Sequence, residues 1–141
     1  MNKILTIVLC LITLVIKAQP PSPGKGETML RGFYRVYITA SSQDADLEKI
    51  EQKLATLRKK YCTTACLKQF KMLVKQTDAD PIIKAQDMDL GVLQTLSVKP
   101  DRQKANRYTV KYSDTTDSRE TTTIYVTLKQ ESGLLKIAYL E

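Results

Sequence analysis

Two cysteines near the middle of the chain, Cys62 and Cys66, place a pair of thiols four positions apart. On one continuous helix their Cα atoms would lie about 6 Å apart, within disulfide range, but their side chains would run in parallel. A helix break at Thr63 would make a bridge easier. We therefore predict either a structural disulfide or two reduced, buried thiols. Redox chemistry is a third alternative, which the three intervening residues disfavour because the reactive motif has two.

Four aspartates, Asp78, Asp80, Asp87 and Asp89, form the densest acidic group and flank Gln86. Carboxylates at such spacings could act as an acid/base pair or bind a hard cation. The same Asp-x-Asp-Pro pattern also lets a chain leave a helix and turn, with carboxylate oxygens accepting backbone N–H bonds. The segment lacks the glycine and the terminal glutamate of a calcium loop. We predict no metal site.

Several tyrosines could line the open mouth of a fold, where a phenol is both an apolar wall and a hydrogen-bonding group. They could equally be core residues whose hydroxyls reach the surface. Together with the acidic segment they provide the candidate binding residues Tyr34, Tyr37, Tyr61, Gln86, Asp87 and Tyr108.

The composition excludes several classes of chemistry. The 141 residues include no histidine and no tryptophan, so a Ser/His or Cys/His pair, a His-ligated metal and an imidazole switch are all absent. Three cysteines are too few for a Cys-only zinc site or an iron–sulfur cluster. The five glycines form no phosphate-binding pattern. We predict binding in preference to catalysis, without a cofactor, and keep an enzyme using Asp87 and Tyr61 as an alternative.

The formal net charge of +7 is spread along the chain and does not indicate nucleic-acid binding. The most concentrated basic stretch is Arg58-Lys59-Lys60, continued at helical spacing by three further lysines, Lys68, Lys71 and Lys75. This pattern predicts a solvated helix face or, alternatively, a docking patch for an acidic partner.

The N-terminus is typical of an export signal. Lys3 precedes an uncharged apolar run of 13 residues, Ile4–Ile16, which is shorter than the roughly 20 residues that span a bilayer. A small residue and a proline-rich stretch follow, so we predict a signal peptide over residues 1–18, cleaved after Ala18, and a disordered leader over 19–26. The protein is then periplasmic or secreted, without a membrane anchor. An uncleaved anchor or a buried strand is the alternative.

Three segments that must position these side chains have helical periodicity. Apolar residues repeat at 3.6-residue spacing over 30–38, 47–61 and 67–74. The first segment is rich in aromatic and β-branched residues, which favour strands, but its periodicity predicts a helix. The third helix would be capped by Thr63 or Thr64 and end near Asp78, because Pro81 disfavours a helical residue before it.

The second half of the chain alternates apolar and polar residues over 93–98, 108–112, 124–128 and 135–139, with Ser132-Gly133 as the last turn. Consecutive strands form an antiparallel meander whose apolar face needs a cover. We therefore predict one α+β domain over residues 27–141, in which three N-terminal helices pack on a curved antiparallel sheet.

Three strings resemble those of a family of exported bacterial proteins classed as a domain of unknown function: FYRVY at 33–37, LRKKYCT at 57–63 and DADPIIKAQD at 78–87. That family is similar to the cone-shaped nuclear-transport-factor-like and cystatin-like fold, and the resemblance covers residues 27–141. One departure is Leu135, where such proteins often carry a tryptophan. The resemblance implies the fold and carries over no catalytic residue.

These features together predict an exported, non-catalytic binding module with a protein partner. Its concrete form is a periplasmic immunity protein that neutralises a secreted toxin, since a basic face with tyrosines suits a protein partner. A protein with a small-ligand pocket inside the cone is the alternative. The oligomeric state is left open.

Overall fold

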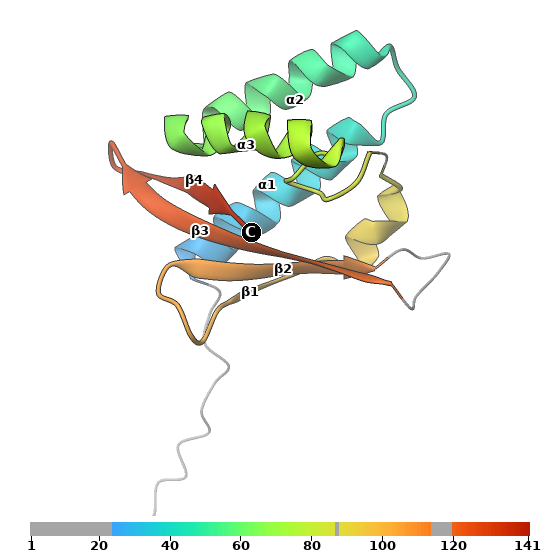
Figure 1. Ribbon diagram of the computed structural model, residues 1–141. Helices are drawn as coiled ribbons and strands as arrows, with labels where there is room; N and C mark the ends of the chain where they lie inside the picture. The colour runs from blue at the N-terminus through green and yellow to red at the C-terminus, as the bar shows by residue number, and fades with distance from the viewer. Residues whose placement is uncertain (1–23, 87, 114–119) are drawn as a thin grey trace, which may run out of the picture.

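The computed structural model describes residues 24–86, 88–113 and 120–141. Three helices precede a four-stranded antiparallel sheet, which confirms the predicted α+β class. The helix α1 lies along one face of the sheet, and α2 and α3 lie above α1 in this view (Figure 1). The helix α3 also contacts β4. The elements are α1 (Lys25–Ser41), α2 (Leu47–Tyr61), α3 (Thr64–Thr77), the 3-10 helix η1 (Leu90–Gln94), β1 (Ser97–Pro100), β2 (Arg107–Ser113), β3 (Thr121–Glu131) and β4 (Leu134–Leu140).

The helix α1 is the centre of the core. Its apolar face is fully buried and consists of Leu30, Phe33, Tyr34, Tyr37 and Ile38. The helical periodicity of this segment therefore outweighs its strand propensity. The helix begins at Lys25, so the last residues of the predicted leader are helical. The predicted signal peptide lies outside the described residues. Within the described part of the chain, no helix is long and apolar enough to cross a membrane.

The junction between α2 and α3 has the break that the sequence predicts. Cys62 ends α2 in an extended conformation, and the Thr63 hydroxyl accepts a hydrogen bond from the Cys66 amide at 3.2 Å, which caps α3. The Thr63 amide also donates to the Ile137 carbonyl at 2.8 Å, which ties the junction to β4. Both cysteines are buried and free, so the predicted disulfide is not formed and the alternative of two reduced thiols describes the structure.

The strands follow one another in the order β1-β2-β3-β4. Buried and exposed residues alternate along β2 and β3 as predicted, but not along the whole of β4. There the register with β3 shifts between Thr127 and Leu128, which leaves Ala138 as an extra residue, a β-bulge. Beyond this bulge the alternation is reversed. Tyr139, which we predicted to share a face with Ile137, is 50% exposed on the outer face, and Leu140 is buried instead.

The predicted first strand is shorter than its sequence pattern. The Asp89 carboxylate accepts a hydrogen bond from the Gly91 amide at 2.6 Å and starts η1, which contains Leu93. Only the end of the segment, from Ser97, pairs with β2. A 3-10 turn places residues three apart on one side, so Leu93 and Leu96 match a turn as well as a strand.

Two glycines of α1 test the packing of this helix on the sheet. A Cβ on Gly26 would lie 2.2 Å from the Tyr108 hydroxyl oxygen, whereas one on Gly32 would meet nothing within 4 Å. We expect Gly32→Ala to stabilise the protein by about 0.5–1 kcal/mol through helix propensity. Gly26→Ala should be less stable than Gly32→Ala by about 1–3 kcal/mol, because the Tyr108 ring must be displaced. Urea unfolding measures both, and equal stabilities would contradict this packing.

Candidate functional site

The most densely connected polar group in the interior joins α1, α2 and the turn after α3. The Tyr37 hydroxyl donates to Asp80 Oδ2 at 2.6 Å and accepts from Arg58 Nη1 at 2.7 Å. The other Arg58 nitrogen, Nη2, donates to Glu51, and Arg58 Nη1 lies 3.8 Å from Asp80 Oδ2. We call Tyr37, Glu51, Arg58 and Asp80 the Arg58 cluster.

Arg58 is 5% exposed and does not belong to a solvated basic face, contrary to the prediction for the run 58–60. Its guanidinium lies 4.4 Å from the centre of the Phe70 ring of α3, a cation–π contact. The signal for its burial is in the sequence. Arg58 follows the buried Leu54 by four residues, so both lie on the face of α2 that packs inward.

The turn after α3 holds Asp80 in place. Asp78 ends α3 with a left-handed backbone (φ 53°), and Asp80 Oδ1 accepts from the Ile82 amide at 2.8 Å. The Asp80 amide donates to the Ala85 carbonyl at 3.1 Å, and the Gln86 side chain donates to the Asp78 carbonyl at 2.9 Å. Asp78 and Asp80 therefore have the structural role that is the alternative to acid/base chemistry.

A hollow of about 440 Å³ lies over the Arg58 cluster. Its lining combines an apolar wall from α3 with the polar groups of the turn: Glu51, Arg58, Phe70, Val74, Asp78, Ala79, Asp80, Ala85 and Gln86. Three carboxylates surround one guanidinium, so the hollow is acidic in balance. It could accept a small polar group, but Arg58 and Asp80 at its floor are already bonded to each other and to Tyr37.

Three groups of this region are harder to ionise than usual: Asp80, Tyr37 and Cys62. Burial raises the pKa of Asp80 above its ordinary value, against the hydrogen bond from Tyr37. Burial and then the nearby Asp80 raise the pKa of Tyr37, so its proton stays on the oxygen. A hydrogen bond to Cys66, and burial, also raise the pKa of the Cys62 thiol. A reactive thiolate at Cys62 is therefore disfavoured.

The structure separates the predicted binding residues. Tyr37 lies beneath the hollow and Gln86 on its rim, whereas Tyr34 is fully buried in the core and lines no open mouth. Tyr61 is half-buried, with its ring centre 5.1 Å from that of Phe33. Tyr108 is half-buried against Gly26 at the start of α1 and does not line the hollow. Asp87 lies outside the described residues.

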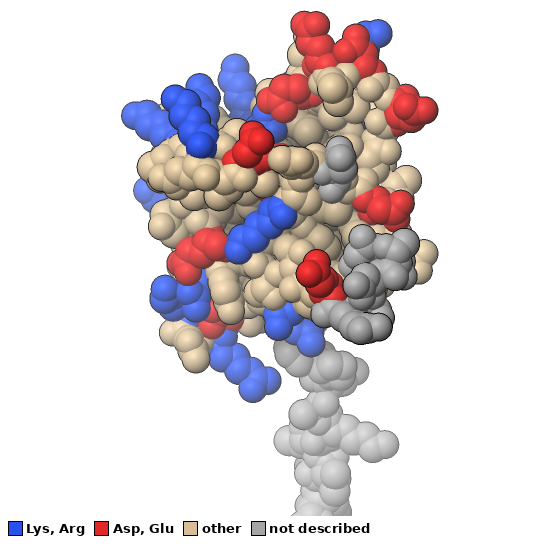
Figure 2. All heavy atoms as spheres, turned by 45° about the vertical axis from the view of Figure 1, so that its right-hand side comes forward, with Lys and Arg blue, Asp and Glu red and all other residues tan. Residues whose placement is uncertain are grey.

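Charges are separated over the helical layer. Figure 2 shows Lys and Arg side chains gathered on one side of the upper surface and carboxylates on the other. The lysines of α3, predicted from helical spacing, are exposed and surround Met72 in a hollow of about 460 Å³. We call Lys68, Lys71, Met72 and Lys75 the α3 lysine surface.

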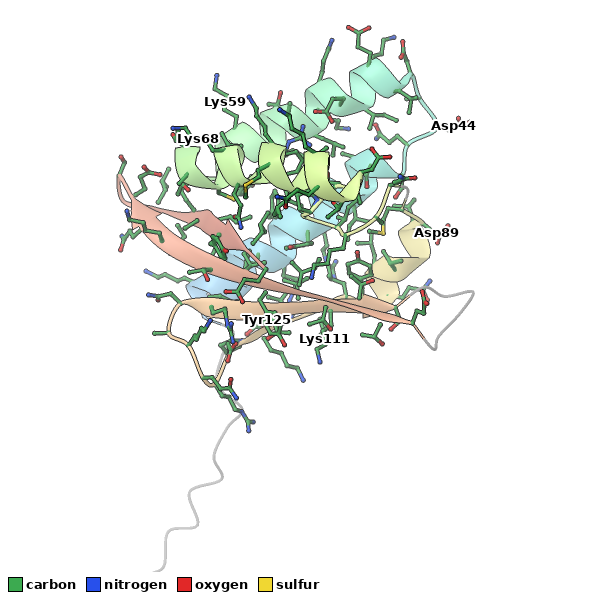
Figure 3. All side chains as sticks on the ribbon, in the orientation of Figure 1. Asp44, Lys59, Lys68, Asp89, Lys111 and Tyr125 are labelled. Carbon is green, nitrogen blue, oxygen red and sulfur yellow. The ribbon has the colours of Figure 1, made fainter. Side chains whose placement is uncertain are left out.

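A second surface, which the sequence analysis missed, is the outer face of the sheet. No described helix covers it, and Lys111 and Tyr125 point away from the helices there (Figure 3). Tyr125 is 37% exposed, and the Arg107 guanidinium lies 4.7 Å from the centre of its ring. Arg107 Nε also donates to Asp101 at 2.6 Å, and Nη1 donates to Glu141 at 3.1 Å.

This face contains a hollow of about 400 Å³ between the first three strands. We call it the sheet hollow, and its lining residues are Ser97, Lys99, Pro100, Asp101, Arg102, Gln103, Arg107, Thr109, Lys111 and Tyr125. The alternation of β2 and β3 contains the signal for it, because every second residue must face away from the core. The predicted binding residues Tyr34, Tyr37 and Tyr108 face the core instead.

Two tyrosines of α1 form a matched pair for testing the Arg58 cluster. Both are fully buried, but among the described residues Tyr34 is recorded without a hydrogen-bond partner for its hydroxyl. We expect Tyr37→Phe to cost about 1–3 kcal/mol, since it removes a partner from two buried charged groups. Tyr34→Phe should change stability by less than about 1 kcal/mol, or raise it. Urea unfolding compares them, and equal losses would contradict the assignment.

The raised pKa of Asp80 predicts a pH dependence of stability. A group whose pKa is raised on folding stabilises the native state below its unfolded pKa of about 4, and this contribution is lost as the pH rises through the raised value. The difference in unfolding free energy between wild type and Asp80→Asn should therefore fall as the pH rises from about 4. Denaturant titrations across pH 4–7 measure it. A difference that is constant, or that grows with pH, would be inconsistent with a raised pKa.

Comparison with known proteins gives the fold and no family. No protein-family model matches the chain, and no curated protein matches it in sequence. A protein of unknown function from Bacteroides thetaiotaomicron VPI-5482 is similar in structure, with a TM-score of 0.74 and 26% sequence identity. The alignment covers 82% of this chain and 88% of that one.

A second solved structure is the type VI effector–immunity complex Tae3–Tai3 from Ralstonia pickettii. The match has a TM-score of 0.53 and 18% identity, and it covers 82% of this chain and 93% of that one. At this identity the likeness shows the fold alone. The immunity-protein prediction is compatible with this fold.

Proposed function

We propose that this protein is an exported, non-catalytic binding module that acts as an immunity protein against a secreted toxin. The observation that carries the proposal is the outer face of the sheet, where an exposed tyrosine is stacked by a buried arginine beside a hollow. Tyrosine and arginine are the residue types enriched at the centres of protein interfaces. The likeness to the immunity protein of a solved effector–immunity complex supports a protein partner.

The interior chemistry also favours binding over catalysis. The polar groups best placed to act on a substrate, Tyr37 and Asp80, bond to each other and to Arg58. Burial raises the pKa of both, so Tyr37 does not serve as a base at neutral pH. The chain has no histidine to replace them.

Export is the second part of the proposal and rests on the apolar run Ile4–Ile16 followed by Ala18. An immunity protein has to be in the compartment where its toxin acts. Removal of residues 1–18 also removes Cys10, which leaves the buried pair Cys62 and Cys66 as the remaining cysteines.

Co-expression with toxin candidates tests the function. We expect the protein to form a stable complex with the product of a neighbouring gene and to restore growth of cells that direct this product to the periplasm. Deletion of residues 2–18 should abolish the rescue and leave binding of the purified proteins unchanged, since only the location is altered. Growth curves and isothermal titration calorimetry measure the two effects. The proposal fails if no such product binds, or if binding gives no rescue.

A further inference from the structure

We propose that the sheet hollow around Tyr125 is the docking surface for the protein partner, and that the partner presents an acidic, carboxylate-rich segment to it. The inference rests on the proposed function and assigns it a surface and a partner chemistry.

The strand register brings the cations of the hollow together. Lys99 of β1, Thr109 of β2 and Tyr125 of β3 pair in one row across the sheet. Lys111 lies two residues along β2, in the adjacent row with Ser97. Diagonal neighbours on one face of a sheet lie about 7–8 Å apart, so both ammonium groups can reach one extended acidic segment.

The cations of the sheet hollow are not neutralised within the described structure. Lys99, Arg102 and Lys111 have no recorded ion pair with the described residues, whereas the one carboxylate of the lining, Asp101, is bonded to Arg107. Backbone and guanidinium hydrogen bonds hold the pKa of Asp101 below its ordinary value, so it stays ionised beside Arg107. The balance of the hollow is therefore positive and complements a row of carboxylates.

A fixed aromatic anchor distinguishes this surface from other exposed positions. The ring of Tyr125 packs against the guanidinium of Arg107, and Asp101 and Glu141 hold that guanidinium from two directions. A side chain that is ordered before binding loses less conformational entropy on association. Tyr139 lies on the same outer face, one strand further on, and extends the aromatic surface.

The α3 lysine surface is the competing candidate for an acidic partner. It is also basic and exposed, but it contains three lysines and one methionine and no tyrosine or arginine. Lysine is depleted at interface centres, because its flexible, strongly hydrated ammonium group loses much on binding. A second copy of this chain is disfavoured at the sheet hollow, since two such faces would bring like charges together.

A titration followed by nuclear magnetic resonance tests the surface without knowledge of the partner. The probe is a capped peptide of six glutamates, added to the ¹⁵N-labelled protein. We expect saturable shifts at the amides of Lys99, Thr109, Lys111 and Tyr125, and weaker shifts on α3. Higher salt should weaken the binding, because exposed charges are screened. Shifts centred on α3, or no saturable shifts, would overturn the proposal.

Two charge-reversal variants with the same change in net charge provide the control. Lys99→Glu/Lys111→Glu should weaken peptide binding by about tenfold or more, whereas Lys68→Glu/Lys71→Glu should weaken it by less than about threefold. All four positions are exposed, so both variants should keep the wild-type fold, which their spectra verify. The opposite ranking of the two variants would overturn the proposal. Tyr125→Ala should also weaken binding, through the loss of the anchor.

The complex with a toxin separates this inference from the function on which it rests. Amide hydrogen exchange should show protection on β2 and β3 around Tyr125 when the toxin is bound. Protection confined to α2 and α3 would overturn the docking surface and leave the proposed function standing. If no toxin binds the wild-type protein, the function fails, and the peptide titration still decides whether the hollow binds acidic segments.

Discussion

The buried guanidinium of Arg58 is the constraint on which the arrangement of the helices depends. An unpaired charge in the interior is strongly unfavourable, so Arg58 can be buried only while its partners are present. Those partners come from distant parts of the chain: Tyr37 is 21 residues away, and Asp80 lies 43 residues beyond Tyr37. One side chain therefore requires α1, α2 and the turn after α3 to meet in a single geometry.

The same network continues into the sheet. Asp80 holds the turn through the Ile82 amide, and this turn places Ile82 and Ile83 in the core. The Tyr112 hydroxyl of β2 donates to the Ile83 carbonyl, so the turn is fixed between the helices and the strands. The acidic segment, which is chemically conspicuous in the sequence, thus serves the architecture. The carboxylates of Asp80 and Asp89 are occupied by hydrogen bonds within the fold, which favours another surface for binding.

The periodicity of apolar residues in the sequence predicts the helices and strands of this fold well, but it predicts the roles of single residues poorly. The helical period in α1 and the alternation in β2 and β3 arise because each element buries one face, and both are visible in the sequence. The reversal at Ala138 is not visible, since a bulge depends on how β4 pairs with β3. Arg58 shows a related limit, because its spacing from Leu54 places it on the inward face of α2 but does not identify its partners. It was predicted to be solvated as part of a basic run, and only its pairing with residues far along the chain allows its burial.

The candidate site illustrates why outward-facing residues escape such prediction. The strand period shows which residues face outward, but it does not show which of them are neighbours. Lys99, Thr109 and Tyr125 become neighbours only through strand register. The two basic surfaces also differ in what their positions allow them to do. The lysines of α3 stand on an exposed helix without an aromatic residue in their hollow, an arrangement suited to long-range electrostatic attraction and not to tight docking. The cations of the sheet hollow surround an ordered tyrosine, an arrangement that can hold a partner once it has arrived.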